Sequence, residues 1–323
     1  MFFNVLNPNA MKKNAERVEK QVYILAIILS ELYNKYMKKT KGFLIIIGGD
    51  VSLPSEAGTV DETVSEEMHE TETKILNKFC GLLAEEKARI EIIPTASGIP
   101  KRSSQRYKEA FKNLGYENIG VLDIRNREEA QSRDLIKRIK EAQGVLFTGG
   151  NQLRLTTIWG GTEISEVLFE RYINEPVVIA GTSAGAMAMA DTMIYEGSSH
   201  EALQKGRVKL SRGFGLLHNV IIDTHFVKRG RIGRLFQAVA SSPSSLGIGL
   251  GEDTGLLISE GNIQEAIGSG LIIIVDGTSI RYTNMASINE GELISIENLS
   301  VHVMVPGDKF FLSERKFQHS TIN

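Results

Sequence analysis

The sequence predicts an α/β fold in which a mostly parallel central sheet is flanked by helices, with a small β-rich C-terminal part. Two observations predict this fold. Short apolar runs alternate with helical patterns from Gly42 to about residue 180, and such runs are typical of strands buried on both faces. Beyond residue 183 the apolar runs become shorter and are broken more often by glycine.

Five apolar runs in the first part are predicted strands. They are Phe43–Ile47, Ile90–Ile93, Val121–Ile124, Val145–Phe147 and Val177–Ala180. Helical patterns lie between them, around residues 74–87, 103–114, 127–142 and 163–173. Because a helix that joins two neighbouring strands makes a right-handed crossover, this alternation predicts a parallel sheet covered by helices.

Small and polar residues follow four of these predicted strands. The four segments are Gly48–Gly49, Pro94–Ser97, Thr148–Gln152 and Gly181–Ser183. Ligands bind at the carboxyl ends of the strands in sheets of this kind. We therefore expect the functional site where these four loops converge.

Five further runs are predicted strands of the C-terminal part. They are Val220–Ile222, Leu246–Leu250, Leu256–Ile258, Leu271–Val275 and Leu293–Ile296. Their glycine-broken pattern predicts antiparallel or mixed additions at the edge of the sheet and a small β-rich tail.

The chain divides into an N-terminal helical extension at 1–41 and a single α/β domain at 42–323. The apolar run Val22–Leu29 is too short to cross a bilayer, which needs about 20 residues, so no membrane span is predicted. The longer segment Lys12–Lys39 fits one amphipathic helix. A different possibility is that translation starts at Met37 and that the upstream segment is only an extension. Residues 51–72 form a polar, acidic loop, and 61–72 contain six acids and no base.

Composition excludes several classes of function. The 37 basic and 39 acidic residues give a net charge of −2 without a basic face, which argues against nucleic-acid binding. The six histidines have neither the spacing nor the cysteine partners of a zinc site, and we expect no metal or other cofactor. The single cysteine, Cys80, favours a reducing cytoplasm and a buried structural thiol.

Ser183 is the first candidate nucleophile. The apolar run before it breaks directly into Gly181-Thr-Ser-Ala-Gly-Ala186, and small neighbours let the backbone turn sharply enough to expose the serine. A helix from Ala184 to about Ala190 would direct its first amides at a developing oxyanion. A glycine-rich packing turn or a phosphate-binding turn is the alternative interpretation.

A nucleophilic serine needs a base, and the base needs a group that holds its tautomer. His225 ends a strand-like run and is favoured over His200 and His218. Asp223 lies two residues earlier on the same face and could orient the imidazole or bind substrate. The other acids in range are Asp191, Glu196 and Glu201.

Arginines gather directly after His225, in the segment Lys228-Arg-Gly-Arg-Ile-Gly-Arg234. On a helix, Arg231 and Arg234 would share one face and could grip a carboxylate with paired hydrogen bonds, which suggests an acidic substrate. A solvated basic helix start or a set of structural salt bridges is the alternative.

Five blocks of the sequence together resemble the cyanophycinases, over roughly residues 42–275. The blocks are Phe147–Leu153, Gly181–Ala186, Asp191–Ile194, Asp223–Phe226 with Arg229–Arg234, and Gly247–Thr254. Cyanophycinases are serine peptidases related to peptidase E, on a fold similar to class I glutamine amidotransferases. They hydrolyse cyanophycin, a polyaspartate with arginine on each side-chain carboxylate, to β-Asp-Arg dipeptides.

The resemblance implies a cytoplasmic serine peptidase, a homodimer, with Ser183 as nucleophile, His225 as base and Glu201 as the third member. It implies an oxyanion hole at the amides of Gly150 and Ala184. The substrate-binding residues that it implies are Gln152, Asp223, Arg229, Arg231 and Arg234. Two departures from the family pattern are the acidic insertion and Thr224, which stands where glutamine is common.

Two other functions stay open. One is a peptidase E-like hydrolase of short Asp-X peptides, and the other is a non-catalytic member of the same fold. A glutamine amidotransferase is disfavoured because its nucleophile is cysteine, whereas the turn in this chain carries serine.

Overall fold

A computed structural model describes residues 39–49, 74–85 and 87–320. The acidic loop predicted at 51–72 lies outside the described residues, as does all but the end of the predicted extension at 1–41. Residues 39–41 are not helical and lead directly into the first strand. None of the helices in the described ranges is long and apolar enough to cross a membrane.

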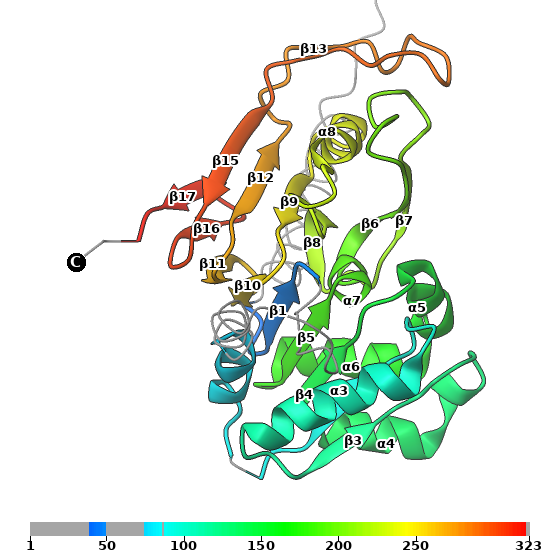
Figure 1. Cartoon of the computed structure of the whole chain (residues 1–323), viewed down its shortest axis with the longest axis vertical. Helices are drawn as coiled ribbons and strands as arrows, with labels where there is room; N and C mark the ends of the chain where they lie inside the picture. Colours follow the sequence, from blue (N-terminus) through cyan, green and yellow to red (C-terminus); the bar gives the residue numbers. More distant parts are fainter. Residues whose placement is uncertain (1–38, 50–73, 86, 321–323) are drawn as a thin grey trace, which may run out of the picture. The chain divides into compact units, whose positions relative to one another are not determined.

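Five parallel strands form one side of a nine-stranded sheet (Figure 1). In the order β1-β5-β4-β2-β3, they are β1 (Phe43–Ile47), β5 (Val178–Thr182), β4 (Gly144–Phe147), β2 (Ile90–Ile93) and β3 (Ile119–Val121). The predicted parallel sheet is therefore confirmed. Strand β3 ends before the predicted Val121–Ile124 does, because the chain turns where the amide of Ile124 donates to Leu122 O.

Helices cover both faces of these parallel strands, since the strand residues alternate between two buried clusters. The described part of a helix at 74–81 and α3 (Pro100–Asn113) lie on one face. On the other face lie α4 (Arg133–Glu141), α5 (Gln152–Trp159) and α6 (Glu163–Asn174). The helix predicted over 127–142 is divided into a 3-10 turn at Glu129–Gln131 and α4. Helix α5 was not predicted, and it starts where the Asn151 side chain accepts from the amide of Arg154.

The remaining strands form more than edge additions, so that prediction is partly wrong. Four antiparallel strands extend the first sheet beyond β1, namely β10 (Thr254–Ser259), β11 (Ile263–Gly268), β16 (Lys309–Phe311) and β17 (Lys316–Gln318). The others build a second sheet. In the order β15-β12-β9-β8-β6-β7, its strands are β15 (Ser300–Met304), β12 (Ile272–Asp276), β9 (Leu246–Leu250), β8 (Leu217–Asp223), β6 (Ala190–Glu196) and β7 (Lys209–Arg212).

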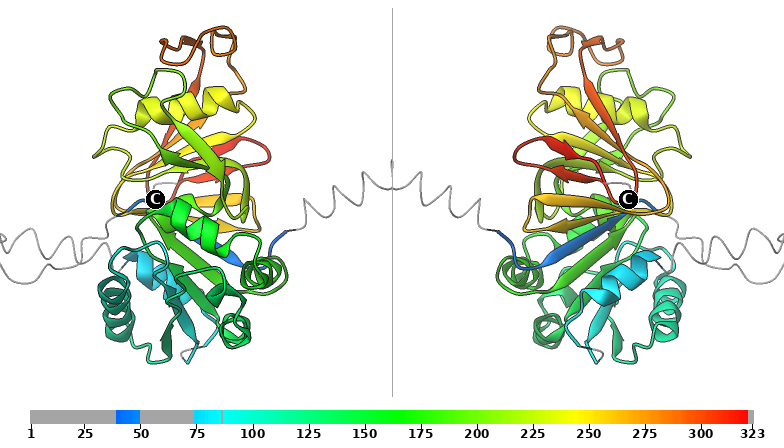
Figure 2. Two further views of the ribbon diagram at one scale, coloured as in Figure 1. Left: turned by 90° about the vertical axis from the view of Figure 1, so that its right-hand side faces the viewer. Right: turned by 90° about the vertical axis from the view of Figure 1, so that its left-hand side faces the viewer.

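The second sheet is partly parallel, because β8 runs parallel to both β6 and β9. Helix α8 (Ile232–Ser241) packs on it, and the short pair β13 (Tyr282–Thr283) and β14 (Ile296–Glu297) lies apart from both sheets. Figure 2 shows the later strands, coloured yellow to red, gathered on one side of the parallel strands, with α3 to α6 at the other.

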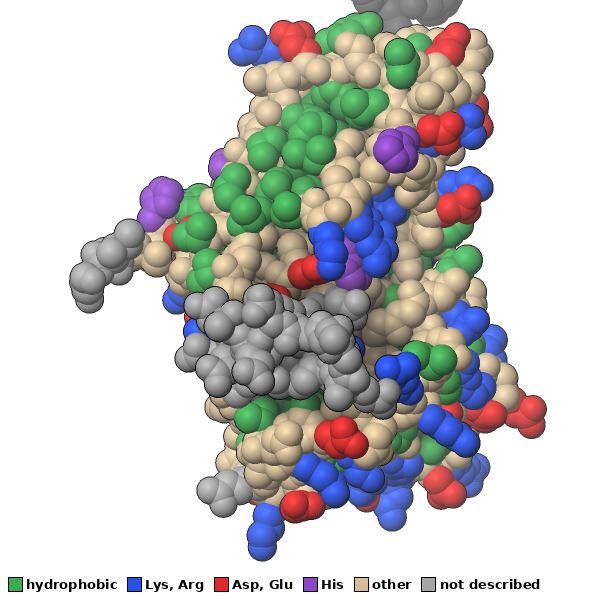
Figure 3. All heavy atoms as spheres, viewed as in Figure 1, with side chains coloured by type: hydrophobic (Ala, Val, Ile, Leu, Met, Phe, Trp, Pro, Cys, Tyr) green, Lys and Arg blue, Asp and Glu red, His purple; other side chains and the backbone are tan. Residues whose placement is uncertain are grey.

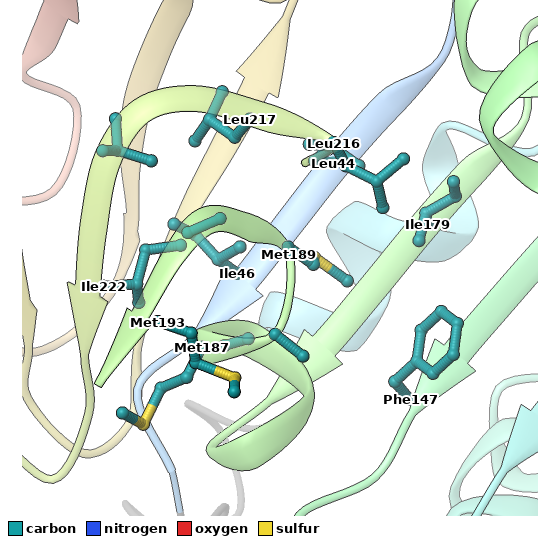
Figure 4. Packing of buried hydrophobic residues seen from close by; sticks show 14 of the residues in the cluster. Leu44, Ile46, Phe147, Ile179, Met187, Met189, Met193, Leu216, Leu217 and Ile222 are labelled. Carbon is teal, nitrogen blue, oxygen red and sulfur yellow. The ribbon is translucent and has the colours of Figure 1, made fainter. Parts of the chain in front are cut away.

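The two sheets share one buried cluster, seen in Figure 4. Leu44 and Ile46 of β1 contribute to it from the first sheet, and Met193 of β6 and Ile222 of β8 contribute from the second. All four side chains are fully buried. This shared core holds the ends of β5 and β8 together, and those two strands carry the site described next.

Candidate active site

Ser183 lies in a sharp turn at the end of β5, as predicted. Its backbone has φ 52° and ψ −112°, a conformation that side chains rarely adopt and that costs roughly 1–3 kcal/mol. The amide of Ser183 donates to Ile47 O at the end of β1, which fixes the turn against the neighbouring strand. The side chain is half-buried, so the hydroxyl lies within reach of a substrate.

The glycines around this turn are required by close backbone contacts. A Cβ added to Gly181 would lie 2.5 Å from the carbonyl carbon of Gly185, and one added to Gly185 would lie 2.5 Å from Phe147 O. The small residues around Ser183 therefore have the role that the sequence predicts for them. The following helix, α7, is only the single turn Ala184–Met187, shorter than the predicted 184–190, because β6 already begins at Ala190.

His225 lies beside Ser183, with 3.1 Å between Ser183 Oγ and His225 Nε2. It follows β8 by two residues and has φ 51°, and its amide donates to Gly48 O at 2.6 Å. The neighbouring Gly49 leaves room for the ring, since a Cβ at that position would lie 2.3 Å from His225 Cε1. The loops after β1, β5 and β8 thus meet at one point.

Glu252 is the acid that contacts the imidazole, at 3.1 Å between Glu252 Oε1 and His225 Nδ1. Its other oxygen, Oε2, lies 3.0 Å from Nζ of Lys228. Strand pairing explains this position. Strands β8 and β9 are parallel neighbours, and His225 and Glu252 each stand two residues beyond the end of their strand.

Glu201 does not occupy the position that the sequence analysis gave it. Its side chain is about half exposed and lies 3.8 Å from Nε of Arg207, within a turn segment between β6 and β7. The contact to His225 is made by Glu252 instead. The sequence signal for Glu252 was a strand-like run followed by Gly251-Glu-Asp253, in the block Gly247–Thr254.

The surroundings of His225 keep the imidazole neutral. Burial lowers the pKa of His225 below its usual 6.5, and Arg229 and Arg231 lower it further, against the opposing effect of Glu252. Burial alone raises the pKa of Glu252, but hydrogen bonds with His225 and Lys228 outweigh burial and hold that pKa below 4.5. A neutral imidazole next to an ionised carboxylate is the state that a general base needs.

Gly150 and Ala184 carry the two backbone amides predicted to form the oxyanion hole. Gly149 runs beside the serine, since a Cβ at Gly149 would lie 3.4 Å from Ser183 Cβ. Gly150 has φ 143°, and a Cβ there would lie 2.1 Å from Ala96 O. Within the described residues, neither the Gly150 nor the Ala184 amide donates to another backbone carbonyl. Both are therefore available for the oxyanion-hole role predicted for them.

Asp223 is fully buried and is bound by arginines, not by His225. Arg234 Nε and Nη2 each donate to its carboxylate at 2.6 Å, and Arg231 Nη1 donates at 3.2 Å. Arg234 is itself only 5% exposed. Asp223 and Arg234 thus support the loop that carries His225, and the substrate-binding role predicted for these two residues stays a prediction. Thr224 is buried as well, with its hydroxyl against Met187 Sδ.

The other predicted substrate-binding residues lie nearer the surface. Arg229 is exposed, and Arg231 remains partly exposed while it donates to Asp223 and Thr224 O. Gln152, at the start of α5, donates its side-chain amide to Ile194 O at 2.9 Å. Figure 3 draws one face of the molecule, and near the middle of that face basic side chains gather beside a histidine and an acidic side chain.

The remaining candidate residues lie elsewhere. His200 is in an exposed turn. His218 lies near the start of β8, with its Nδ1 3.7 Å from Asp191 Oδ2. Cys80 is buried, and burial raises its pKa to about 12, so the thiol is unreactive as expected. Within the described ranges, no three His, Cys, Asp or Glu side chains are placed to hold a metal ion.

Known proteins share both the sequence and the fold of this chain. A family model described as Peptidase family S51 matches residues 63–266. The cyanophycinases of Trichormus variabilis and of a Nostoc species are each 38% identical over 242 residues, which is 75% of this chain and 81% of theirs. The cyanophycinase of Thermosynechococcus vestitus is 32% identical over 249 residues, 77% of each chain.

A solved structure agrees at the level of fold. The crystal structure of a peptidase from an acI-B1 Actinobacterium superposes with a TM-score of 0.61 at 20% identity. The superposition covers 86% of this chain and 99% of that one.

Proposed function

Because the chain belongs to peptidase family S51 and is a serine-type peptidase, we propose that it hydrolyses cyanophycin to β-Asp-Arg dipeptides through an acyl-enzyme. The relatives that cover three quarters of the chain are named cyanophycinases, and the residues that match the family model include the strands that precede Ser183 and His225. The single observation that carries the proposal is the contact series from Ser183 through His225 to Glu252, with both separations at 3.1 Å.

In the first half of the reaction, Ser183 Oγ attacks the carbonyl carbon of a backbone amide of the polymer while His225 Nε2 accepts the hydroxyl proton. The amides of Gly150 and Ala184 donate to the oxygen that becomes negative. The C–N bond then breaks, and His225 gives the proton to the leaving amine. Glu252 holds the imidazole in the tautomer with its proton on Nδ1 and stabilises the imidazolium.

In the second half, a water molecule attacks the ester that links the substrate to Ser183. His225 takes a proton from this water and returns it to Ser183 Oγ as the C–O bond breaks. The product leaves with a free carboxylate, and the enzyme is restored. These steps use side chains and backbone amides alone.

The charges around the site fit the substrate. Each repeat of cyanophycin carries a free carboxylate and a free guanidinium on its arginine branch. Arg229 has no carboxylate partner among the described residues, and it lies close enough to lower the pKa of His225. We assign Arg229, together with Arg231 and Gln152, to substrate binding. Asp223 and Arg234 hold the His225 loop in place.

Incubation of the purified protein with insoluble cyanophycin, following release of β-Asp-Arg, tests the proposal. The wild type should release the dipeptide, and Ser183→Ala should lower the rate roughly 10^4- to 10^6-fold. Turnover of short Asp-X peptides without release from cyanophycin would point to a peptidase E-like enzyme. No turnover of either substrate would point to a non-catalytic role.

The proposal also includes a homodimer in the cytoplasm. The family resemblance supports the dimer, and the single, buried cysteine supports a reducing compartment. Light scattering coupled to size-exclusion chromatography should give twice the chain mass of 35.6 kDa. A mass of 35.6 kDa at micromolar concentration would contradict the dimer.

A further inference from the structure

Two arginines converge on one carbonyl oxygen next to the candidate oxyanion hole. Arg125 Nη1 and Nη2 both donate to Ser97 O at 3.2 Å, and Arg154 Nη1 donates to the same oxygen at 3.3 Å. Arg125 comes from the segment after β3, and Arg154 is the third residue of α5. Two guanidinium groups are therefore held side by side by residues distant in the sequence.

This arginine pair lies one loop away from the nucleophile. Ala96 O, directly before Ser97, accepts from the amide of Asn151 at 2.9 Å. Ala96 O would lie 2.1 Å from a Cβ added to Gly150, so the two segments are in close contact. The preceding residue, Gly149, lies next to the side chain of Ser183. A substrate chain that passes the Gly150 amide would thus meet the arginine pair next.

The pair carries unneutralised positive charge. Asp123 lies 3.5 Å from Arg125 Nη1, and Arg125 also donates to Pro94 O and Thr95 O. Arg154 is exposed, and within the described residues its side chain contacts Ser97 O and no carboxylate. A guanidinium has five N–H donors, so most of those on Arg154 face solvent. An anion could therefore bind them in the paired geometry that carboxylates favour.

We propose that Arg154, supported by Arg125, forms a carboxylate-binding subsite for a polymer repeat beyond those that flank the cleaved bond. The inference rests on the proposed function, because every repeat of the polymer presents a free carboxylate on its arginine branch. Arg229 belongs to the loop that carries His225, whereas Arg154 contacts Ser97 O next to the Gly150 turn. The two guanidiniums would hold a chain at two points and make a long substrate bind better than a short one.

Variants of Arg154 test the subsite through the dependence on substrate length. The variants are Arg154→Gln and Arg154→Lys. Arg281→Gln, at an exposed residue directly before β13, is the control of the same charge change. On cyanophycin oligomers of four or more repeats, Arg154→Gln should raise KM roughly 10-fold at nearly unchanged kcat. On the shortest oligomer that is cleaved, KM should change less than 2-fold. Arg154→Lys should recover part of the loss, because an ammonium keeps the charge without the paired donors.

A binding measurement separates this inference from the proposed function. In the Ser183→Ala background, calorimetry with a soluble cyanophycin oligomer of four repeats as the probe should show binding that weakens several-fold with Arg154→Gln and not with Arg281→Gln. Equal binding by both variants, or an equal rise in KM for long and short oligomers, would overturn the subsite even if the wild type hydrolyses cyanophycin. If the wild type hydrolyses nothing, the proposed function fails, and the comparison of oligomer binding alone decides the subsite.

Discussion

Glu252 and Glu201 are both glutamates near a basic side chain, yet within the described residues only Glu252 contacts the imidazole of His225. This difference gives a matched pair of substitutions. We expect Glu252→Gln to lower kcat roughly 10^3- to 10^4-fold, because the amide can donate to Nδ1 and favour the wrong tautomer. Glu201→Gln, on an exposed turn, should change kcat less than 2-fold. Steady-state kinetics on cyanophycin measures both, and equal losses in the two variants would remove Glu252 from the catalytic set.

The lowered pKa of His225 predicts the acid limb of the pH profile. The imidazole acts as a base only when neutral, so kcat/KM should rise with pH through the pKa of His225 in the free enzyme. Because burial and the two arginines hold that pKa below 6.5, the midpoint of the rise should lie below pH 6.5. In Arg229→Gln, one cause of the lowering is lost, and the limb should move toward higher pH. A limb centred above 6.5 in the wild type, or a shift to lower pH in Arg229→Gln, would contradict this reading.

Local sequence was enough to find Ser183 and His225, but not Glu252. A strand that ends in small residues around one serine can be recognised within ten residues, and so can a histidine at the end of an apolar run. The position of Glu252 depends on which strands are neighbours, because its contact with His225 exists only since β9 pairs in parallel with β8. Burial of Asp223 likewise could not be read from the sequence, since its partner Arg234 reaches it from α8.

At the scale of elements, the glycines on the two sides of the Ser183 turn, Gly181 in β5 and Gly185 in α7, leave no room for a side chain. A Cβ at Gly181 would lie 2.5 Å from Gly185 C, a backbone atom that cannot move aside. We expect Gly181→Ala to lower the free energy of unfolding by about 1–3 kcal/mol and to reduce kcat by displacing Ser183.

Gly81 is the matched control for that substitution. It lies in the helix at 74–81, and a Cβ there would meet nothing within 4 Å. Gly81→Ala should therefore raise the free energy of unfolding by about 0.5–1 kcal/mol. Urea denaturation of both variants checks the pair, and an unchanged midpoint for Gly181→Ala would show that the turn can relax.

The elements themselves were predictable to different degrees. The parallel strands and their helices alternate regularly along the chain, and the structure confirms the sheet that this alternation predicts. The second sheet was missed because strand partners cannot be read from the sequence. Apolar runs such as Leu246–Leu250 look alike whether they join the first sheet or the second.

At the scale of the whole described structure, the C-terminal turn links the two sheets. Arg315 lies in the turn between β16 and β17 of the first sheet, and its guanidinium binds Asp276 at the end of β12 in the second sheet and Ser244 O. Asp276 is buried, and burial alone raises its pKa. Hydrogen bonds from Arg315 and Thr278 outweigh that effect and hold the pKa below the usual 3.8.

This link predicts a pH-dependent contribution to stability. We expect Arg315→Gln to lower the free energy of unfolding by about 1–3 kcal/mol at pH 7, because Asp276 then keeps a buried charge with fewer donors. Since the pKa of Asp276 is lower in the folded protein than in the unfolded chain, its contribution is complete above pH 3.8 and is lost as the pH falls through the folded-state pKa.

The difference in the free energy of unfolding between wild type and Arg315→Gln should therefore shrink from pH 7 to pH 3. The control is Lys316→Met, at an exposed neighbouring residue, which should have little effect at either pH. Urea denaturation at both pH values measures this, and a difference that stays constant or grows toward pH 3 would show that the Arg315 contact does not act through the ionised carboxylate.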